Sequence, residues 1–172
     1  MHKQKNIFLI GLMGTGKTTV GRQLSRKLKM EFYDSDRIIE ERTGADIPLI
    51  FEKEGEDGFR KREAAIIDEL TKKKNIILAT GGGAVLNNEN RNHLINRGTV
   101  FYLKSNLKTL LQRTSKDKNR PLLHADEPAD IILQRLLDQR GPLYEEAADH
   151  TIETANNSIH SVIQAIIKHL QS

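Results

Sequence analysis

Eight residues near the N-terminus constrain this chain more than any other feature. Residues 11–18 read GLMGTGKT and match the phosphate-binding loop pattern G-x-x-x-x-G-K-[ST] at every fixed position. The apolar run at 7–10 precedes them as a buried strand would, and residues 18–29 follow with apolar side chains at helical spacing. A strand, a glycine-rich turn and a helix in this order predict a backbone cradle for the phosphates of a nucleoside triphosphate.

The loop pattern assigns a role to each side chain that it fixes. Lys17 is expected to reach the β- and γ-phosphates, and the Thr18 hydroxyl to hold Mg²⁺. The predicted cofactor is therefore Mg²⁺, with ATP as co-substrate. The residues predicted to contact the nucleotide here are Gly14, Thr15, Gly16, Lys17, Thr18 and Thr19.

Strand-like and helix-like segments alternate along the rest of the chain. Further strands are predicted at 31–34, 75–80, 99–103 and 150–153. Helices are predicted from 38 to near 44 and at 59–70, 86–96, 107–114, 128–139 and 159–170. Gly141 and Pro142 are expected to end the helix that begins at 128, and a short helix is expected to resume after them and run through 147. Five strands, each followed by helices, predict an α/β protein with a doubly wound five-stranded parallel sheet, in a single domain over residues 1–172.

Composition excludes several other classes of protein. The 172 residues contain no cysteine, which rules out disulfides, thiolate metal sites and a cysteine nucleophile. No apolar run approaches the roughly 18 residues of a membrane span, so we expect a cytoplasmic protein without a membrane partner. The net charge of +4 suits small anions as well as nucleic acid, but the five phenylalanines and three tyrosines form no base-stacking array, and we expect no nucleic-acid partner.

Two further groups of residues follow predicted strands. Asp34 and Asp36 stand at the end of the second strand, where one carboxylate suits a magnesium-bound water and the other a substrate hydroxyl. The alternative is that one aspartate only caps the next helix. Gly81, Gly82 and Gly83 follow the third strand and would let a ligand approach backbone N–H groups, although a flexible loop is a fair alternative.

Arginines are less informative one by one. On sequence alone, Arg60 and Arg140 are as expected of solvated surface residues. Arg120 lies in a polar, basic stretch at about 116–127, which we interpret as a lid that closes over the phosphates.

Taken together, the motifs of this chain resemble the shikimate kinase family over nearly its whole length. They occur in order as GLMGTGKTT (11–19), EFYDSD (31–36), GFRKRE (58–63), LATGGG (78–83), KNRPLL (118–123) and RGPLYEEAAD (140–149). The resemblance implies a P-loop kinase fold with a lid and a small substrate-binding segment at about 35–62. It also implies transfer of the ATP γ-phosphate to the 3-hydroxyl of shikimate, a step toward chorismate and the aromatic amino acids.

The resemblance further implies how shikimate is held. Asp36 would hold its hydroxyls, Arg60 and Arg140 would bind its carboxylate, and the backbone of Gly81 and Gly82 would contribute, with Gly82 offering its N–H.

On the nucleotide side, the resemblance places Asp34 near magnesium and Arg120 on the transferring phosphate as the lid arginine. Arg113 and Asn157 would lie against the adenine. Lys17, Asp34, Asp36 and Arg120 are thus the predicted catalytic residues, and Thr18 and Asp34 the predicted metal site.

Two alternative functions fit the phosphate-binding loop. A kinase of another small acid or alcohol, such as a gluconate kinase, would use the same scaffold, but the glycine run and the paired arginines argue against it. A P-loop switch or ATPase acting on protein or nucleic acid would show ATP hydrolysis stimulated by the polymer. With shikimate and ATP as the partners, we expect a monomer.

Overall fold

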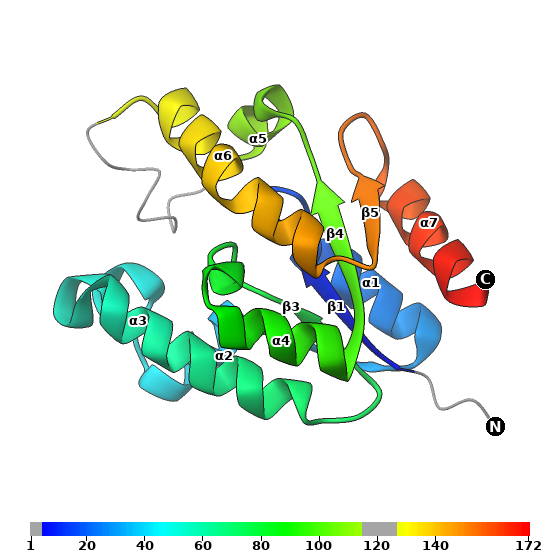
Figure 1. Cartoon of the computed structure of the whole chain (residues 1–172), viewed down its shortest axis with the longest axis horizontal. Helices are drawn as coiled ribbons and strands as arrows, with labels where there is room; N and C mark the ends of the chain where they lie inside the picture. The colour runs from blue at the N-terminus through cyan, green and yellow to red at the C-terminus, as the bar shows by residue number, and fades with distance from the viewer. Residues whose placement is uncertain (1–4, 115–126) are drawn as a thin grey trace.

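A single parallel sheet forms the centre of the molecule. The computed structural model describes residues 5–114 and 127–172. In these ranges five strands pair in the order β2-β3-β1-β4-β5, and every pairing is parallel (Figure 1). The strands are β1 (Asn6–Ile10), β2 (Glu31–Asp34), β3 (Ile76–Ala79), β4 (Gly98–Lys104) and β5 (His150–Glu153). The predicted sheet is confirmed.

Helices cover both faces of the sheet because successive side chains of each strand point to opposite sides. Ile7 and Leu9 of β1 pack toward α1 and α7, whereas Phe8 and Ile10 pack toward the layer that contains α3, α4 and α6. The doubly wound α/β fold is therefore confirmed (Figure 1). The helices are α1 (Lys17–Leu28), α2 (Ser35–Thr43), α3 (Ile47–Thr71), α4 (Asn88–Arg97), α5 (Leu107–Thr114), α6 (Ala129–Ala147) and α7 (Ile159–Gln171).

Helix α3 begins twelve residues before the predicted helix at 59–70. The Asp46 side chain accepts a hydrogen bond of 3.0 Å from the Leu49 N–H and so caps the new start. Gly55 has φ 73° and ψ 179°, which is not helical, and divides α3 into two parts. The segment predicted at 35–62 therefore contains α2, the part of α3 before Gly55 and the first turns of the part after it.

Helix α6 runs without interruption to Ala147, so the prediction that Gly141 and Pro142 end it is wrong. A proline inside a helix costs about 3 kcal/mol. Buried residues nevertheless recur every three or four positions through this segment, and burying one large apolar side chain stabilises by about 1.5–3 kcal/mol. These buried residues are Leu133, Leu136, Arg140, Tyr144 and Ala147. The packing of this stripe outweighs the missing backbone hydrogen bond.

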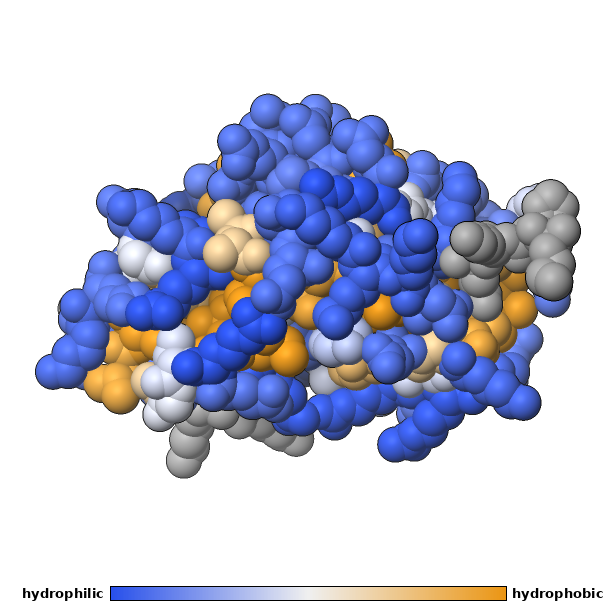
Figure 2. Space-filling view, turned by 90° about the horizontal axis from the view of Figure 1, so that it is seen from below, coloured by the Kyte–Doolittle hydropathy of each residue, from blue (hydrophilic) through white to orange (hydrophobic). Residues whose placement is uncertain are grey.

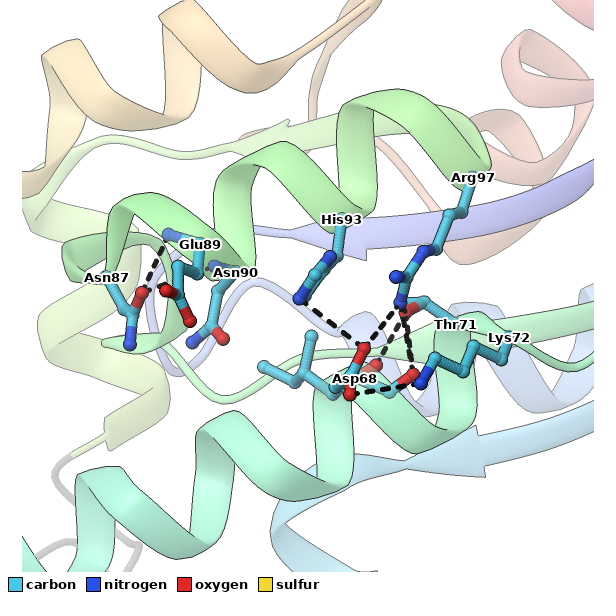
Figure 3. A network of polar contacts seen from close by, with 9 residues as sticks. Asp68, Thr71, Lys72, Asn87, Glu89, Asn90, His93 and Arg97 are labelled. Carbon is cyan, nitrogen blue, oxygen red and sulfur yellow. Dashed lines mark hydrogen bonds and ion pairs between the residues drawn. The ribbon is translucent and has the colours of Figure 1, made fainter.

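The helix predicted at 86–96 is divided in two. A short 3-10 turn, η1 (Ala84–Leu86), follows the glycine run, and α4 starts after Asn87. The Asn87 side chain accepts hydrogen bonds from the N–H groups of Glu89 at 2.7 Å and Asn90 at 3.3 Å (Figure 3). This cap sets the boundary that apolar spacing alone misses.

Asp68 joins α3 to α4. Arg97 Nη1 lies 2.8 Å from Asp68 Oδ1 and also donates to the Thr71 hydroxyl, and His93 Nε2 lies 3.4 Å from the same carboxylate oxygen (Figure 3). The Arg97 guanidinium, and after it the Lys72 ammonium, hold the pKa of Asp68 below its usual value. These contacts join the C-terminal end of α3 to α4.

The surface is mainly polar. On the face shown in Figure 2, hydrophilic side chains dominate and hydrophobic residues show between them. Among the described residues the exposed large hydrophobic side chains are Leu49, Ile95 and Ile131. In the same part of the chain, no helix is both long enough and apolar enough to cross a membrane.

Substitution of Gly141 tests the continuity of α6, and Gly44, which follows α2, is the control. An added Cβ meets no atom within 4 Å at Gly141 or at Gly44, but only Gly44 has a positive φ, of 69°. Gly141→Ala should raise the free energy of unfolding by about 0.5–1 kcal/mol, because alanine is the better helix former. Gly44→Ala should lower it by about 1–2 kcal/mol because of the left-handed backbone. Urea unfolding measures both, and destabilisation by Gly141→Ala would contradict a continuous α6.

Candidate active site

One cavity gathers most of the predicted site residues. It has a volume of about 190 Å³ and lies at the carboxyl ends of β1, β2 and β3. Its lining residues are Gly14, Gly16, Lys17, Thr18, Thr19, Asp34, Asp36, Thr80, Gly81 and Gly82. The phosphate-binding loop, the two aspartates and the glycine run therefore meet at one edge of the sheet, where ligands of such sheets bind.

The phosphate-binding loop is built from backbone conformations that side chains disfavour. Gly14 and Gly16 have φ values of 85° and 90°, and Gly16 precedes the first turn of α1. Lys17 is largely buried, and its Nζ donates to the carbonyls of Gly11 at 2.6 Å and Leu12 at 2.8 Å. The ammonium thus lies against the loop's own backbone, at the N-terminus of α1, where positive potential favours an anion.

Thr15 differs from its neighbours in the loop. Its hydroxyl is buried and donates to the Leu12 carbonyl at 2.9 Å, so the side chain turns back into the loop. Thr15 does not belong to the lining of the cavity. Its predicted contact with the nucleotide stays a prediction that only its backbone N–H can fulfil.

Asp34 performs two tasks at once. One carboxylate oxygen, Oδ1, caps α2 by accepting from the N–H groups of Asp36 at 3.0 Å and Arg37 at 3.3 Å. The other, Oδ2, accepts a hydrogen bond of 2.6 Å from the Thr18 hydroxyl. The helix-capping alternative is therefore correct for Asp34, and it does not remove the residue from the site. A hydroxyl and a carboxylate side by side are hard oxygen donors that fit Mg²⁺.

Each residue of the glycine run makes room for a charged side chain. At Gly81, a Cβ would lie 2.5 Å from Asp36 Oδ1 and 2.8 Å from Glu63 Oε2. At Gly83, it would lie 2.3 Å from Arg60 Nη2. At Gly82, it would lie 3.3 Å from Arg140 Nη1. At Gly81 and Gly83 a side chain would displace these groups, whereas at Gly82 Arg140 would have to move only slightly, so the run serves close packing of the site and not only flexibility.

Arg140 lies inside the structure, and Arg60 is partly buried. Arg140 is buried in α6, and the Arg60 side chain is 21% exposed. Asp36, Arg60 and Arg140 thus come to one glycine turn from α2, α3 and α6. Sequence alone had placed both arginines among solvated residues, and that expectation is wrong for Arg140 because helix α6 continues through this position.

Glu63, to which the sequence assigned no role, belongs to the same cluster as Asp36, Arg60 and Arg140. It is 1% exposed, and its Oε1 accepts a hydrogen bond of 2.9 Å from Arg60 Nη1. Burial raises the pKa of the Glu63 carboxyl above its usual value, and the Arg60 guanidinium opposes that shift. The available signal was an acid three residues after Arg60, on the same face of a helix.

The three residues predicted on the nucleotide side fare differently. Arg113 Nη1 donates to the Gly14 carbonyl at 3.1 Å, so α5 contacts the phosphate-binding loop. Asn157 donates to the Glu153 carbonyl and lines a separate cavity of about 290 Å³ between β5 and α7. Arg120 lies outside the described residues, as does the predicted lid at 116–127 except for its last residue, Glu127.

Comparison with known proteins places the whole chain in one family. The family model described as "Shikimate kinase" matches residues 13–171. The chain is 53% identical over 172 residues to "Shikimate kinase 1" of Escherichia coli (strain K12 / DH10B), covering 100% of this chain and 99% of that protein. It is 52% identical over 171 residues to "Shikimate kinase" of Vibrio parahaemolyticus serotype O3:K6, covering 99% of each.

A solved structure is similar as well. The shikimate kinase of Acinetobacter baumannii in complex with shikimate has a TM-score of 0.94 and 50% sequence identity, over 98% of this chain and 93% of that one. Similarity of this extent covers the sheet, both helical layers and the cavity at the sheet edge. The chain belongs to the shikimate kinase family.

Proposed function

We propose that this protein transfers the γ-phosphoryl group of ATP to the 3-hydroxyl of shikimate, giving shikimate 3-phosphate and ADP on the way to chorismate and the aromatic amino acids. One observation carries the proposal: a pair of arginines and a carboxylate surround a glycine turn at the edge of the phosphate-binding cavity. The relatives described above support the same acceptor.

The chemistry of shikimate fits this cluster. Shikimate is a small acid with three hydroxyls, so it requires cations for its carboxylate and an anion that accepts from hydroxyls. A guanidinium offers two parallel N–H donors to a carboxylate, and Arg60 and Arg140 supply two such groups next to Gly83 and Gly82. In the proposal, Asp36 accepts from the substrate hydroxyls beside Gly81.

Phosphoryl transfer needs positioning and charge neutralisation more than covalent help. In the proposal, Lys17 exchanges its hydrogen bonds to the loop carbonyls for phosphate oxygens, at the positive end of α1. Thr18 and Asp34 would hold Mg²⁺, which neutralises phosphate charge when it is bound with ATP. Thr19 and Arg113 flank the same loop.

Asp34 and Asp36 have different roles in the proposal. Because Asp34 already bonds Thr18 and caps α2, its carboxylate is held on the phosphate side. Asp36, two residues later, lies next to Gly81 on the side of the acid-binding cluster. We therefore assign the orientation of the hydroxyl, and acceptance of its proton, to Asp36.

Release of ADP tests the proposed function. With ATP and Mg²⁺, turnover should occur with shikimate and stay at background with gluconate, a nucleoside monophosphate or nucleic acid, each added singly. Lys17→Met removes the loop cation and should lower kcat by a factor on the order of 100 or more, while the melting temperature changes little. Turnover with gluconate or stimulation by nucleic acid, without turnover on shikimate, would replace the proposal by one of those alternatives.

Conservative variants of Arg60 and Arg140 test whether these arginines bind the shikimate carboxylate. Arg60→Lys and Arg140→Lys keep the charge but lose the fork, so each should weaken shikimate binding by roughly ten- to a hundredfold. ATP binding should change little. For an analogue with a neutral amide in place of the carboxylate, the penalty should largely disappear. If both variants discriminate acid from amide as well as the wild type does, neither arginine reads the carboxylate.

A further inference from the structure

Tyr144 is a buried polar residue beside the proposed acid-binding cluster that no step above uses. It is 0% exposed, and its ring stacks on that of Tyr102 with centroids 4.9 Å apart. A buried hydroxyl requires a hydrogen-bond partner. The Tyr144 hydroxyl donates to the carbonyl of Gly82, 62 residues earlier in the chain.

The same hydroxyl also meets Arg140, which lies one turn earlier on α6. Burial raises the pKa of Tyr144, and the nearby Arg140 guanidinium opposes that shift, so the phenol stays a neutral donor near neutral pH. A tyrosine hydroxyl is both donor and acceptor. Here it donates to Gly82, and its acceptor capacity remains next to the Arg140 guanidinium.

This contact completes the hydrogen bonding of the glycine run. The Gly81 carbonyl accepts from the Ala84 N–H and the Gly83 carbonyl from the Leu86 N–H, each at 3.1 Å. Those two bonds come from η1, whereas the Gly82 carbonyl is bound by Tyr144 of α6. Because three successive glycines have unusual rotational freedom, an anchor on the middle carbonyl restricts the orientation of the peptide that follows.

We propose that Tyr144 is a positioning residue, which holds the Arg140 guanidinium and the Gly82 backbone in one fixed arrangement so that both meet the substrate carboxylate together. This inference rests on the proposed function. Tyr144 itself contacts neither substrate and acts through Arg140 and Gly82. Its removal should therefore affect recognition of the acid and leave the nucleotide side unchanged.

Tyr102 offers a matched control. It belongs to the same stacked pair and is 3% exposed, and burial raises its pKa to about 12. Tyr144→Phe and Tyr102→Phe each remove one hydroxyl from a buried residue and keep the ring. Only the first removes the hydrogen bond to Gly82 and the hydroxyl next to Arg140.

Steady-state kinetics with both substrates should separate the two variants. Tyr144→Phe should raise the KM for shikimate about tenfold, the cost of leaving a buried hydrogen-bond partner unsatisfied, with the KM for ATP unchanged. Tyr102→Phe should leave both constants at wild-type values. With the amide analogue of shikimate, Tyr144→Phe and the wild type should bind alike, because the arrangement serves the carboxylate.

Each other outcome has a definite meaning. Equal shikimate KM values for the two variants, or equal effects of Tyr144→Phe on acid and amide, would overturn the inference while the proposed function stands. To guard against unfolding, both variants are also made with Gly141→Ala. If Tyr144→Phe does not fold even when combined with Gly141→Ala, the inference is also overturned, because the hydroxyl would then be required for the stability of the core. Absence of shikimate turnover in the wild type would instead refute the proposed function.

Discussion

Three helices meet the backbone of one glycine turn, and the site depends on that meeting. The Gly81 N–H donates to the Ser35 hydroxyl at the start of α2 at 3.0 Å, the Gly82 carbonyl accepts from Tyr144 of α6, and Arg60 of α3 lies against Gly83. Side chains at these three positions would meet the charged ends of Asp36, Glu63, Arg140 and Arg60. Their absence lets two arginines and two carboxylates come to one place at the end of β3.

The glycine turn and the phosphate-binding loop are parts of one structure. The hydrogen bond between Thr18 and Asp34 ties the first turn of α1 to the start of α2. Asp36, two residues after Asp34, then lies next to Gly81. In the proposed function, the phosphate at the loop and the hydroxyl at the glycine turn would be separated only by Asp34, Ser35 and Asp36. Phosphoryl transfer requires such proximity.

Local patterns predicted the strands, the parallel sheet and the phosphate-binding loop, because these depend on residues close in sequence. Contacts between distant segments were not predictable in this way. The burial of Arg140 and the role of Glu63 depend on how α6 and α3 reach the glycine turn, and the bond from Tyr144 to Gly82 spans 62 residues. The continuation of α6 past Pro142 was not predictable, because the cost of a proline inside a helix is visible in the sequence, whereas the packing that outweighs this cost is not.

The proposed site depends on the missing side chain at Gly83, which makes room for Arg60 to bind the shikimate carboxylate. Calorimetric titration of shikimate into Gly83→Ala tests it most directly, with Gly141→Ala as the control in open space. Because the new methyl group meets the flexible end of Arg60, stability should change by no more than about 1 kcal/mol while shikimate affinity falls at least about tenfold. Shikimate affinity equal to that of the control, in a folded protein, would contradict the account.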